Sequence, residues 1–242
     1  MFKFLKKIMN NEDVNLTDDA YSLHRILKTD IKKDPNIQED EIIFGCGCFW
    51  GAEKCFWKLP GVVTTSVGYA GGNKNNPTYY EVCSGLTGHS EVVRVIWDKR
   101  EIDISDLLKM FWECHDPTQK NRQGNDLGTQ YRSAIYYTNE YNLETILATK
   151  EQYLKELNKK NFGLIETEIK MIDSYFYAEQ YHQQYLASAG SRQYCSASPT
   201  KVKLGVFTGS NYKLKDNIWE NFNWDIDKCV LRSDNNPIKN NI

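Results

Sequence analysis

A cysteine stands where two different sequence patterns meet. The apolar run of residues 42–44 predicts a strand, and residues 52–59, stopped by a Pro-Gly pair, predict a helix. Between them, residues 47–51 read Gly-Cys-Phe-Trp-Gly. Cys48 would therefore face unpaired backbone N–H groups and the positive end of a helix dipole, which favours the thiolate. Because the thiolate is the nucleophile, Cys48 is a candidate catalytic residue.

The two residues after this cysteine, Phe49 and Trp50, offer large apolar rings. They could form a pocket beside the sulfur for an apolar part of a substrate. The alternative is structural, since cysteine is among the most buried residue types and a lone one is usually a small core hydrophobe. Polar residues further along the chain bear on the choice.

Glu91 opens a predicted strand over residues 91–97. Period-two alternation puts it on the same side as Val93, Val95 and Trp97. A carboxyl on an apolar face loses hydration, which favours its protonated form. A neutral carboxylic acid near a thiol could donate a proton to a substrate oxygen. The alternative is an exposed glutamate at a frayed strand end.

Two tyrosines and an aspartate lie at loop-to-element junctions. The hydroxyls of Tyr79 and Tyr131 could hold an oxygen whose charge grows during a reaction, although ordinary packing is the alternative for each. Asp126 lies in the polar loop of residues 124–128. It could receive a substrate amide N–H, or it could simply form a turn.

Cys195 lies in the polar stretch of residues 189–196. We expect it to be exposed on a mobile segment outside any core, where a thiol can attack an oxidised partner. The alternative is an incidental surface thiol.

The Cys-Gly-Cys run that ends at Cys48 resembles half of a metal site. A structural zinc needs two more ligands at suitable spacing, and His89, His115 and His182 are scattered along the chain. We therefore expect no metal, and we expect Cys46 to be buried in the strand.

Composition limits the class of protein. The chain has 242 residues, a net charge of −2 and 40% hydrophobic residues, enough for one substantial domain. We expect neither nucleic acid nor a membrane as a partner, since the chain has no excess of basic residues and no apolar run long enough to span a bilayer. We also expect a monomer. The seven cysteines are an odd number without an export signal, which favours free thiols in the cytoplasm.

The order of patterns predicts the organisation. The polar composition of residues 1–40 predicts an extension that packs on the domain or stays mobile. We expect the catalytic domain to span residues 41–196. Residues 197–242 predict a long, loosely structured tail with a short helix around 215–222. Helices and strands alternate without a βαβ rhythm, which predicts an α+β two-layer sandwich with a mixed, mainly antiparallel sheet. Besides those already named, we expect strands at 62–69, 132–137 and 165–171. We expect a helix that Ser105 caps, and two more helices over 140–158 and 178–186.

Together, these motifs resemble the A-type peptide methionine sulfoxide reductases. The resemblance includes residues 47–51, 77–79, 81–85, 87–89, 111–112, 115–117, 122–126, 128–133 and 182–186, and covers about residues 41–196. It implies reduction of the S epimer of methionine sulfoxide, free or in oxidised proteins, without a metal or an organic cofactor. Such an enzyme repairs oxidative damage.

The resemblance also implies roles in the reduction step. Cys48 would attack the sulfoxide sulfur and become a sulfenic acid. Glu91 would protonate the sulfoxide oxygen, and Tyr79 and Tyr131 would hydrogen-bond to that oxygen.

Binding and recycling follow in the same way. Phe49 and Trp50 would hold the terminal methyl group of the substrate, and Asp126 would orient it. Cys195 would resolve the sulfenic acid by forming a disulfide with Cys48, and thioredoxin would reduce that disulfide.

The chain departs from the family pattern around its thiols. Cys46 stands where a small residue is usual, and residues 196–198 replace the glycines that often follow the resolving cysteine. Cys229 is separated from Cys195 by 33 residues, and we expect it to be dispensable for that reason. Two rival interpretations are a peroxide-reducing thiol peroxidase and a non-catalytic protein that binds methionine sulfoxide.

Overall fold

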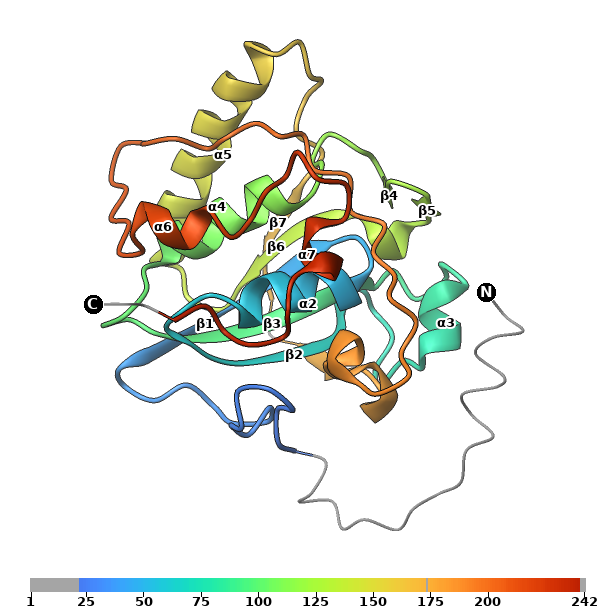
Figure 1. The fold of residues 1–242 in the computed structure, drawn as a ribbon. Coiled ribbons are helices and arrows are strands. Elements are labelled where there is room, and N and C mark those ends of the chain that lie inside the picture. Colours follow the sequence, from blue (N-terminus) through green and yellow to red (C-terminus); the bar gives the residue numbers. More distant parts are fainter. Residues whose placement is uncertain (1–21, 173, 240–242) are drawn as a thin grey trace.

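A computed structural model describes residues 22–172 and 174–239 of the chain. A six-stranded sheet with the order β7-β6-β1-β3-β2-β8 forms its centre (Figure 1). Neighbouring strands are antiparallel, apart from β6 and β7, which run parallel. The prediction of a mixed, mainly antiparallel sheet in an α+β fold is therefore confirmed. The strands of this sheet are β1 (Glu39–Cys46), β2 (Val62–Ala70), β3 (Ser90–Asp98), β6 (Ser133–Tyr137), β7 (Glu168–Met171) and β8 (Tyr175–Tyr177).

Alternation along the strands separates two apolar clusters. Phe44 of β1 and Val93 of β3 face the main core, whereas Ile43 faces a smaller cluster on the other side of the sheet. Helices cover the main-core side. They are α2 (Phe49–Trp57), α4 (Ile104–Cys114) and α5 (Asn142–Asn158), with shorter elements α3 (Tyr79–Cys83), η2 (Thr129–Tyr131), η3 (Gln180–His182), η4 (Tyr185–Ala187), α6 (Asp216–Trp219) and α7 (Cys229–Arg232), and a two-stranded ribbon of β4 (Arg122–Gln123) and β5 (Asp126–Leu127).

The first helix begins earlier than its apolar pattern predicts. Cys48 is the N-cap of α2, and the turn before it needs a glycine: Gly47 has φ 85°, and a Cβ there would lie 2.5 Å from the Cβ of Gln123. The prediction that Ser105 caps α4 is wrong. Asp103 is the cap, and its carboxylate accepts the Ser105 N–H at 2.9 Å.

Other predicted elements need correction. The helix expected over 178–186 is two 3₁₀ turns, because Gln184 between them adopts φ 47°. The strand expected over 165–171 begins only at Glu168, and β8 was not predicted. In α5, Ile146 is buried, whereas its neighbour Leu147 is 48% exposed.

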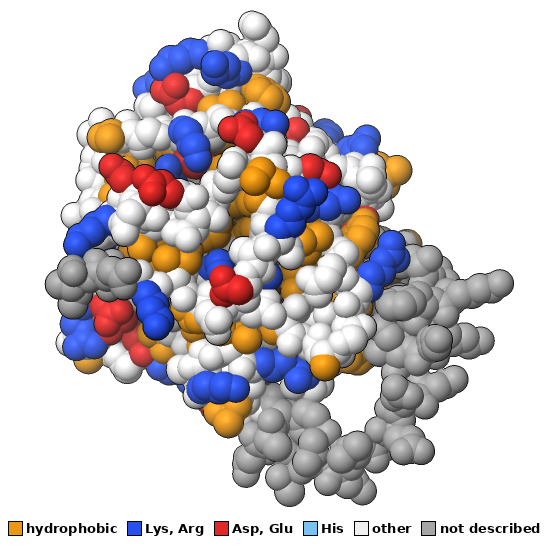
Figure 2. Space-filling model, in the orientation of Figure 1, with side chains coloured by type: hydrophobic (Ala, Val, Ile, Leu, Met, Phe, Trp, Pro, Cys, Tyr) orange, Lys and Arg blue, Asp and Glu red, His pale blue; other side chains and the backbone are white. Residues whose placement is uncertain are grey.

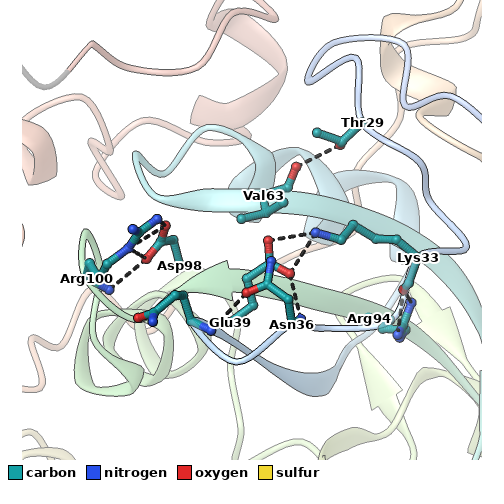
Figure 3. Close-up of polar contacts among 9 residues, drawn as sticks. Thr29, Lys33, Asn36, Glu39, Val63, Arg94, Asp98 and Arg100 are labelled. Carbon is teal, nitrogen blue, oxygen red and sulfur yellow. Dashed lines mark hydrogen bonds and ion pairs between the residues drawn. The ribbon is translucent and has the colours of Figure 1, made fainter.

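The described part of the N-terminal extension packs on the sheet. Figure 3 shows Lys33 paired with Glu39 at 2.6 Å, the Lys33 carbonyl accepting from Arg94, and the Thr29 hydroxyl donating to the Val63 carbonyl at 2.7 Å. These contacts tie residues 22–38 to β1, β2 and β3. Residues 1–21 lie outside the described residues.

The tail has little regular secondary structure, as predicted, but it is packed on the domain and is not loose. Its apolar side chains join the main core although they follow no helical or strand period; they are Val202, Leu204, Phe207, Leu214, Ile218, Phe222, Trp224 and Val230. Helix α6 falls within the predicted short helix at 215–222. The tail therefore completes the helical layer.

The end of the tail is fastened to α2. Lys54 donates to the Ser233 carbonyl at 2.8 Å, and Trp57 Nε1 donates to the Asn235 carbonyl at 3.0 Å. Helix α7, drawn in red, lies against α2 in Figure 1. The helix that begins at Cys48 is thus held between the sheet and the tail.

Basic and acidic side chains are interspersed over the face that Figure 2 shows. This mixture is consistent with the net charge of −2. Within residues 22–172 and 174–239, no helix is both long and apolar enough to cross a bilayer.

Candidate active site

The backbone that begins α2 contacts the carboxyl group of β3. Glu91 Oε2 accepts the Phe49 N–H at 3.1 Å, so the carboxyl lies at the first turn of the helix, next to Cys48. Both side chains are buried, Cys48 at 9% exposed and Glu91 at 1%. A thiol and a carboxyl that are 43 positions apart in the chain thus share one site.

Burial sets the charge of this carboxyl. The pKa of Glu91 is raised to about 8. Loss of hydration is the main cause, the Phe49 N–H opposes it, and the nearby Asp126 adds to it. Around neutral pH the carboxyl is therefore mostly protonated. It carries a proton that it can donate.

The expectation that the helix start makes Cys48 a resting thiolate is wrong. The Trp50 N–H does favour the thiolate, but burial raises the pKa of the Cys48 thiol well above its usual value, and the carboxyl of Glu91 raises it further. A helix terminus is worth only about 0.3–1 kcal/mol in most settings, whereas burying a charge can shift a pKa by several units. The resting site holds a thiol beside a carboxylic acid.

Both tyrosines lie beside this pair. Burial is the main cause of the raised pKa of Tyr79 and of Tyr131. The largest electrostatic cause for each is Glu91, which is charged in the alkaline range where a tyrosine ionises. The Tyr131 hydroxyl is also near Cys48. Both hydroxyls therefore keep their protons and remain hydrogen-bond donors.

The aromatic pair after the cysteine is backed by residues that the sequence did not single out as part of the site. Trp50 stacks on Tyr185 with ring centroids 3.9 Å apart, and its Nε1 donates to His182 Nδ1 at 3.1 Å. Phe49 lies against the same histidine, with ring centroids 5.1 Å apart. These contacts fix both rings as one wall of the site.

Asp126 is the first residue of β5, and one of its two carboxylate oxygens has no hydrogen-bond partner among the described residues. Its Oδ1 accepts the Tyr194 hydroxyl at 2.6 Å, whereas its buried Oδ2 has no partner among the described residues. A buried carboxylate oxygen without a donor is costly. It is therefore a ready acceptor for an N–H group that enters the site.

Cys195 is buried, at 5% exposed, and the prediction of an exposed thiol on a mobile segment is wrong. Burial raises the pKa of this thiol to about 12. The reason is the folded tail: Trp224, Cys229 and Val230 line the same small cavity as Cys195. Distance in the chain therefore does not separate Cys229 from Cys195 in space, and our reason for expecting Cys229 to be dispensable is wrong.

The residues that sequence reasoning missed share one origin. His182, Tyr185 and Tyr194 come from the segment of residues 178–196. The sequence predicted part of this segment, residues 178–186, only as a regular helix. Because the segment is mostly polar, its residues showed no sign of an aromatic contact. The two 3₁₀ turns carry His182 and Tyr185, which contact Trp50, whereas Tyr194 lies in the irregular stretch that follows them.

The geometry can be compared with known proteins. A family model described as peptide methionine sulfoxide reductase matches residues 40–213. This chain belongs to the peptide methionine sulfoxide reductase family. It is 53% identical to the peptide methionine sulfoxide reductase MsrA of Vibrio vulnificus, over 74% of this chain and 86% of that protein. It is 56% identical to the mitochondrial peptide methionine sulfoxide reductase of Mus musculus, over 66% of this chain and 68% of that protein.

Solved structures of the family have the same fold. Methionine sulfoxide reductase A of Corynebacterium diphtheriae superposes with a TM-score of 0.67 at 42% identity, covering 76% of this chain and 88% of that one. Reduced Mxr1 of Saccharomyces cerevisiae superposes with a TM-score of 0.61 at 34% identity, covering 69% and 93%.

Proposed function

We propose that this member of the family reduces the S epimer of methionine sulfoxide, free or in oxidised proteins, to methionine, and so repairs oxidative damage. The observation that carries the proposal is the placement of Glu91. Its carboxyl, with a pKa raised to about 8, accepts the Phe49 N–H at 3.1 Å and lies beside the Cys48 thiol. A nucleophile and a protonated acid thus lie at one buried site.

In the reduction step, the Cys48 sulfur attacks the sulfoxide sulfur while Glu91 protonates the oxygen. The thiol proton passes to Glu91, the S–O bond breaks, and the oxygen ends on Cys48 as a sulfenic acid. The sulfoxide is reduced to a thioether and the thiol is oxidised, so no other reductant enters this step. Tyr79 and Tyr131 donate hydrogen bonds to the oxygen as its charge grows.

The substrate binds between the aromatic rings beside Cys48 and the carboxylate of Asp126. Phe49 and Trp50 hold the terminal methyl group, whose apolar contact favours a methionine side chain. The unpartnered Oδ2 of Asp126 accepts an N–H of the substrate.

Recycling uses the second thiol. Cys195 attacks the sulfur of the sulfenic acid, releases water and forms a disulfide with Cys48, which thioredoxin then reduces by thiol–disulfide exchange. The contact of Cys195 with the first turn of α2 supports this role. We also propose that the protein works as a monomer in the cytoplasm, where its seven cysteines, all within the described part of the chain and all unpaired, stay reduced.

The experiment is an epimer-resolved assay. Each epimer of a dabsylated methionine sulfoxide is incubated first with dithiothreitol and then with thioredoxin as the reductant. We expect reduction of the S epimer alone, with both reductants. Equal reduction of both epimers, or hydrogen peroxide consumption without sulfoxide reduction, would contradict the proposal and favour a thiol peroxidase.

A further inference from the structure

A second group of thiols lies behind the active site, on the main-core side of the sheet. Cys46 ends β1, Cys114 ends α4, and His115 is the next residue. All three are buried, and one ligand atom from each lies within 4.8 Å of the others. We propose that these three residues, with Cys55 as the fourth ligand, bind one thiophilic metal ion of the Zn²⁺ class. This inference is independent of the proposed reductase activity.

The hydrogen bonds of His115 prepare one nitrogen for a metal. Nδ1 lies 2.7 Å from the Phe111 carbonyl. Because a carbonyl only accepts, Nδ1 carries the ring proton and Nε2 carries the lone pair. Histidine ligands in metal sites are commonly oriented by this type of N–H to carbonyl bond.

The lone pair on Nε2 meets a hydroxyl group on the strand that pairs with β1. His115 Nε2 lies 2.8 Å from the Ser133 hydroxyl, and Ser133 is the cross-strand neighbour of Cys46. The hydroxyl has a second partner in Thr167 Oγ1, at 2.8 Å. A metal can therefore replace the serine at Nε2 and leave that hydroxyl satisfied.

Cys55 supplies the fourth sulfur from α2. Its thiol lies near that of Cys114, which in turn lies near that of Cys46. The Cys114 thiol donates to the Phe111 carbonyl at 3.5 Å. The three cysteines line one cavity of about 20 Å³, which Cys195 also lines and His115 does not. The cavity has room for one water-sized particle. A tetrahedral zinc with bonds of ~2.3 Å holds its sulfurs about 3.8 Å apart. The ligand atoms of Cys46, Cys114 and His115 already lie within 4.8 Å of one another and need only small torsional changes to close on the ion, whereas the Cys55 sulfur lies outside that group and has further to move.

The charges nearby suit such a site. Three thiolates and Zn²⁺ leave one negative charge. Lys54 lies near the Cys55 thiol, and Lys228 lines the cavity. Soft thiolate ligands select zinc or monovalent copper over magnesium or calcium.

The sequence argued against a metal because Cys46 had only Cys48 as a near neighbour. In the folded chain, Cys46 and Cys48 lie in different environments. Cys48 caps α2 beside Glu91, and Cys46 faces a Cys-His pair that lies 68 and 69 positions along the chain.

The test is zinc binding by the full-length, reduced protein in equilibrium dialysis at micromolar Zn²⁺. We expect about one equivalent in the wild type, in Cys48→Ser, which removes the nucleophile, and in the control Cys83→Ser, which removes a thiol from α3. Cys46→Ala and His115→Asn should weaken binding by at least about tenfold. No stoichiometric binding in the wild type would overturn the proposal. So would binding that is lost in Cys48→Ser and kept in Cys46→Ala, because the metal would then lie at the active site.

A second measurement leaves the ligand set intact. Cd²⁺ is titrated into the wild type and Cys48→Ser, and the ultraviolet thiolate-to-metal absorption is followed. We expect the same band in both proteins, complete at one equivalent. A band absent from both, or present in the wild type only, would overturn the proposal.

Discussion

Residue 51 can carry no side chain while Cys195 stays in place. A Cβ built on Gly51 would lie 2.5 Å from the Cys195 sulfur, closer than real contacts allow. Gly51 lies three residues after Cys48 on α2, so positions 48 and 51 are neighbours on one side of the helix. The missing side chain therefore lets the second thiol approach the turn that carries the first.

This contact predicts a selective recycling defect in Gly51→Ala. The added methyl group displaces Cys195, whereas Cys48 and Glu91 stay in place. We expect single-turnover reduction within about threefold of wild type, and thioredoxin-driven turnover lowered by about tenfold or more, a barrier increase of ~1.4 kcal/mol. A quenched single-turnover assay measures the rate of reduction, and a steady-state assay with thioredoxin measures the rate of recycling.

Gly163→Ala is the matched control. A Cβ at Gly163 meets nothing within 4 Å, so both rates should equal those of the wild type. Recycling by Gly51→Ala at the wild-type rate would show that Cys195 does not act from this position.

The raised pKa of Glu91 predicts the pH dependence of reduction. The acid is active when protonated, so the single-turnover rate should be flat below the pKa of about 8 and should fall about tenfold per pH unit above it. Glu91→Gln should lose ~10²–10⁴-fold in rate and should lack the break near pH 8.

The half-exposed Glu81, which belongs to the capping box of α3, provides a control. Glu81→Gln should keep the rate and the break. A break that persists near pH 8 in Glu91→Gln would assign the proton to another group.

The packing of the tail predicts a stability effect far from the site. Ile218 of α6 is fully buried in the main core. Ile218→Ala should therefore lower the free energy of unfolding by about 2–5 kcal/mol, measured by urea denaturation. Val206→Ala, at a position 77% exposed, should change it by less than about 0.5 kcal/mol. Equal stability of Ile218→Ala and the wild type would mean that the tail does not contribute to the core.

Local patterns in the sequence predicted the features that depend on one segment. The alternation of Val93, Val95 and Trp97 identified β3 and the face it buries, and with it the environment of Glu91. The turn before Cys48 was visible from its glycine and the apolar runs on each side. Both results rest on neighbours within one element.

Features that depend on distant segments were not predictable in this way. The charge of Cys48 is decided by burial, which the residues around it do not reveal. The tail residues Leu204 and Ile218 follow no period, so their burial and the cover over Cys195 were missed. The left-handed conformation of Gln184, which breaks the expected helix, also has no signal in the residue type.

The most direct test of the account is the fate of the sulfur atoms after one turnover. Cys195→Ser is mixed with the S epimer of methionine sulfoxide without reductant, the sulfenic acid is trapped with dimedone, and the modified cysteine is located by mass spectrometry. We expect one methionine per protein and one label, on Cys48, with no methionine formed by Cys48→Ser. Methionine formed by Cys48→Ser, or a label on another cysteine, would contradict the account.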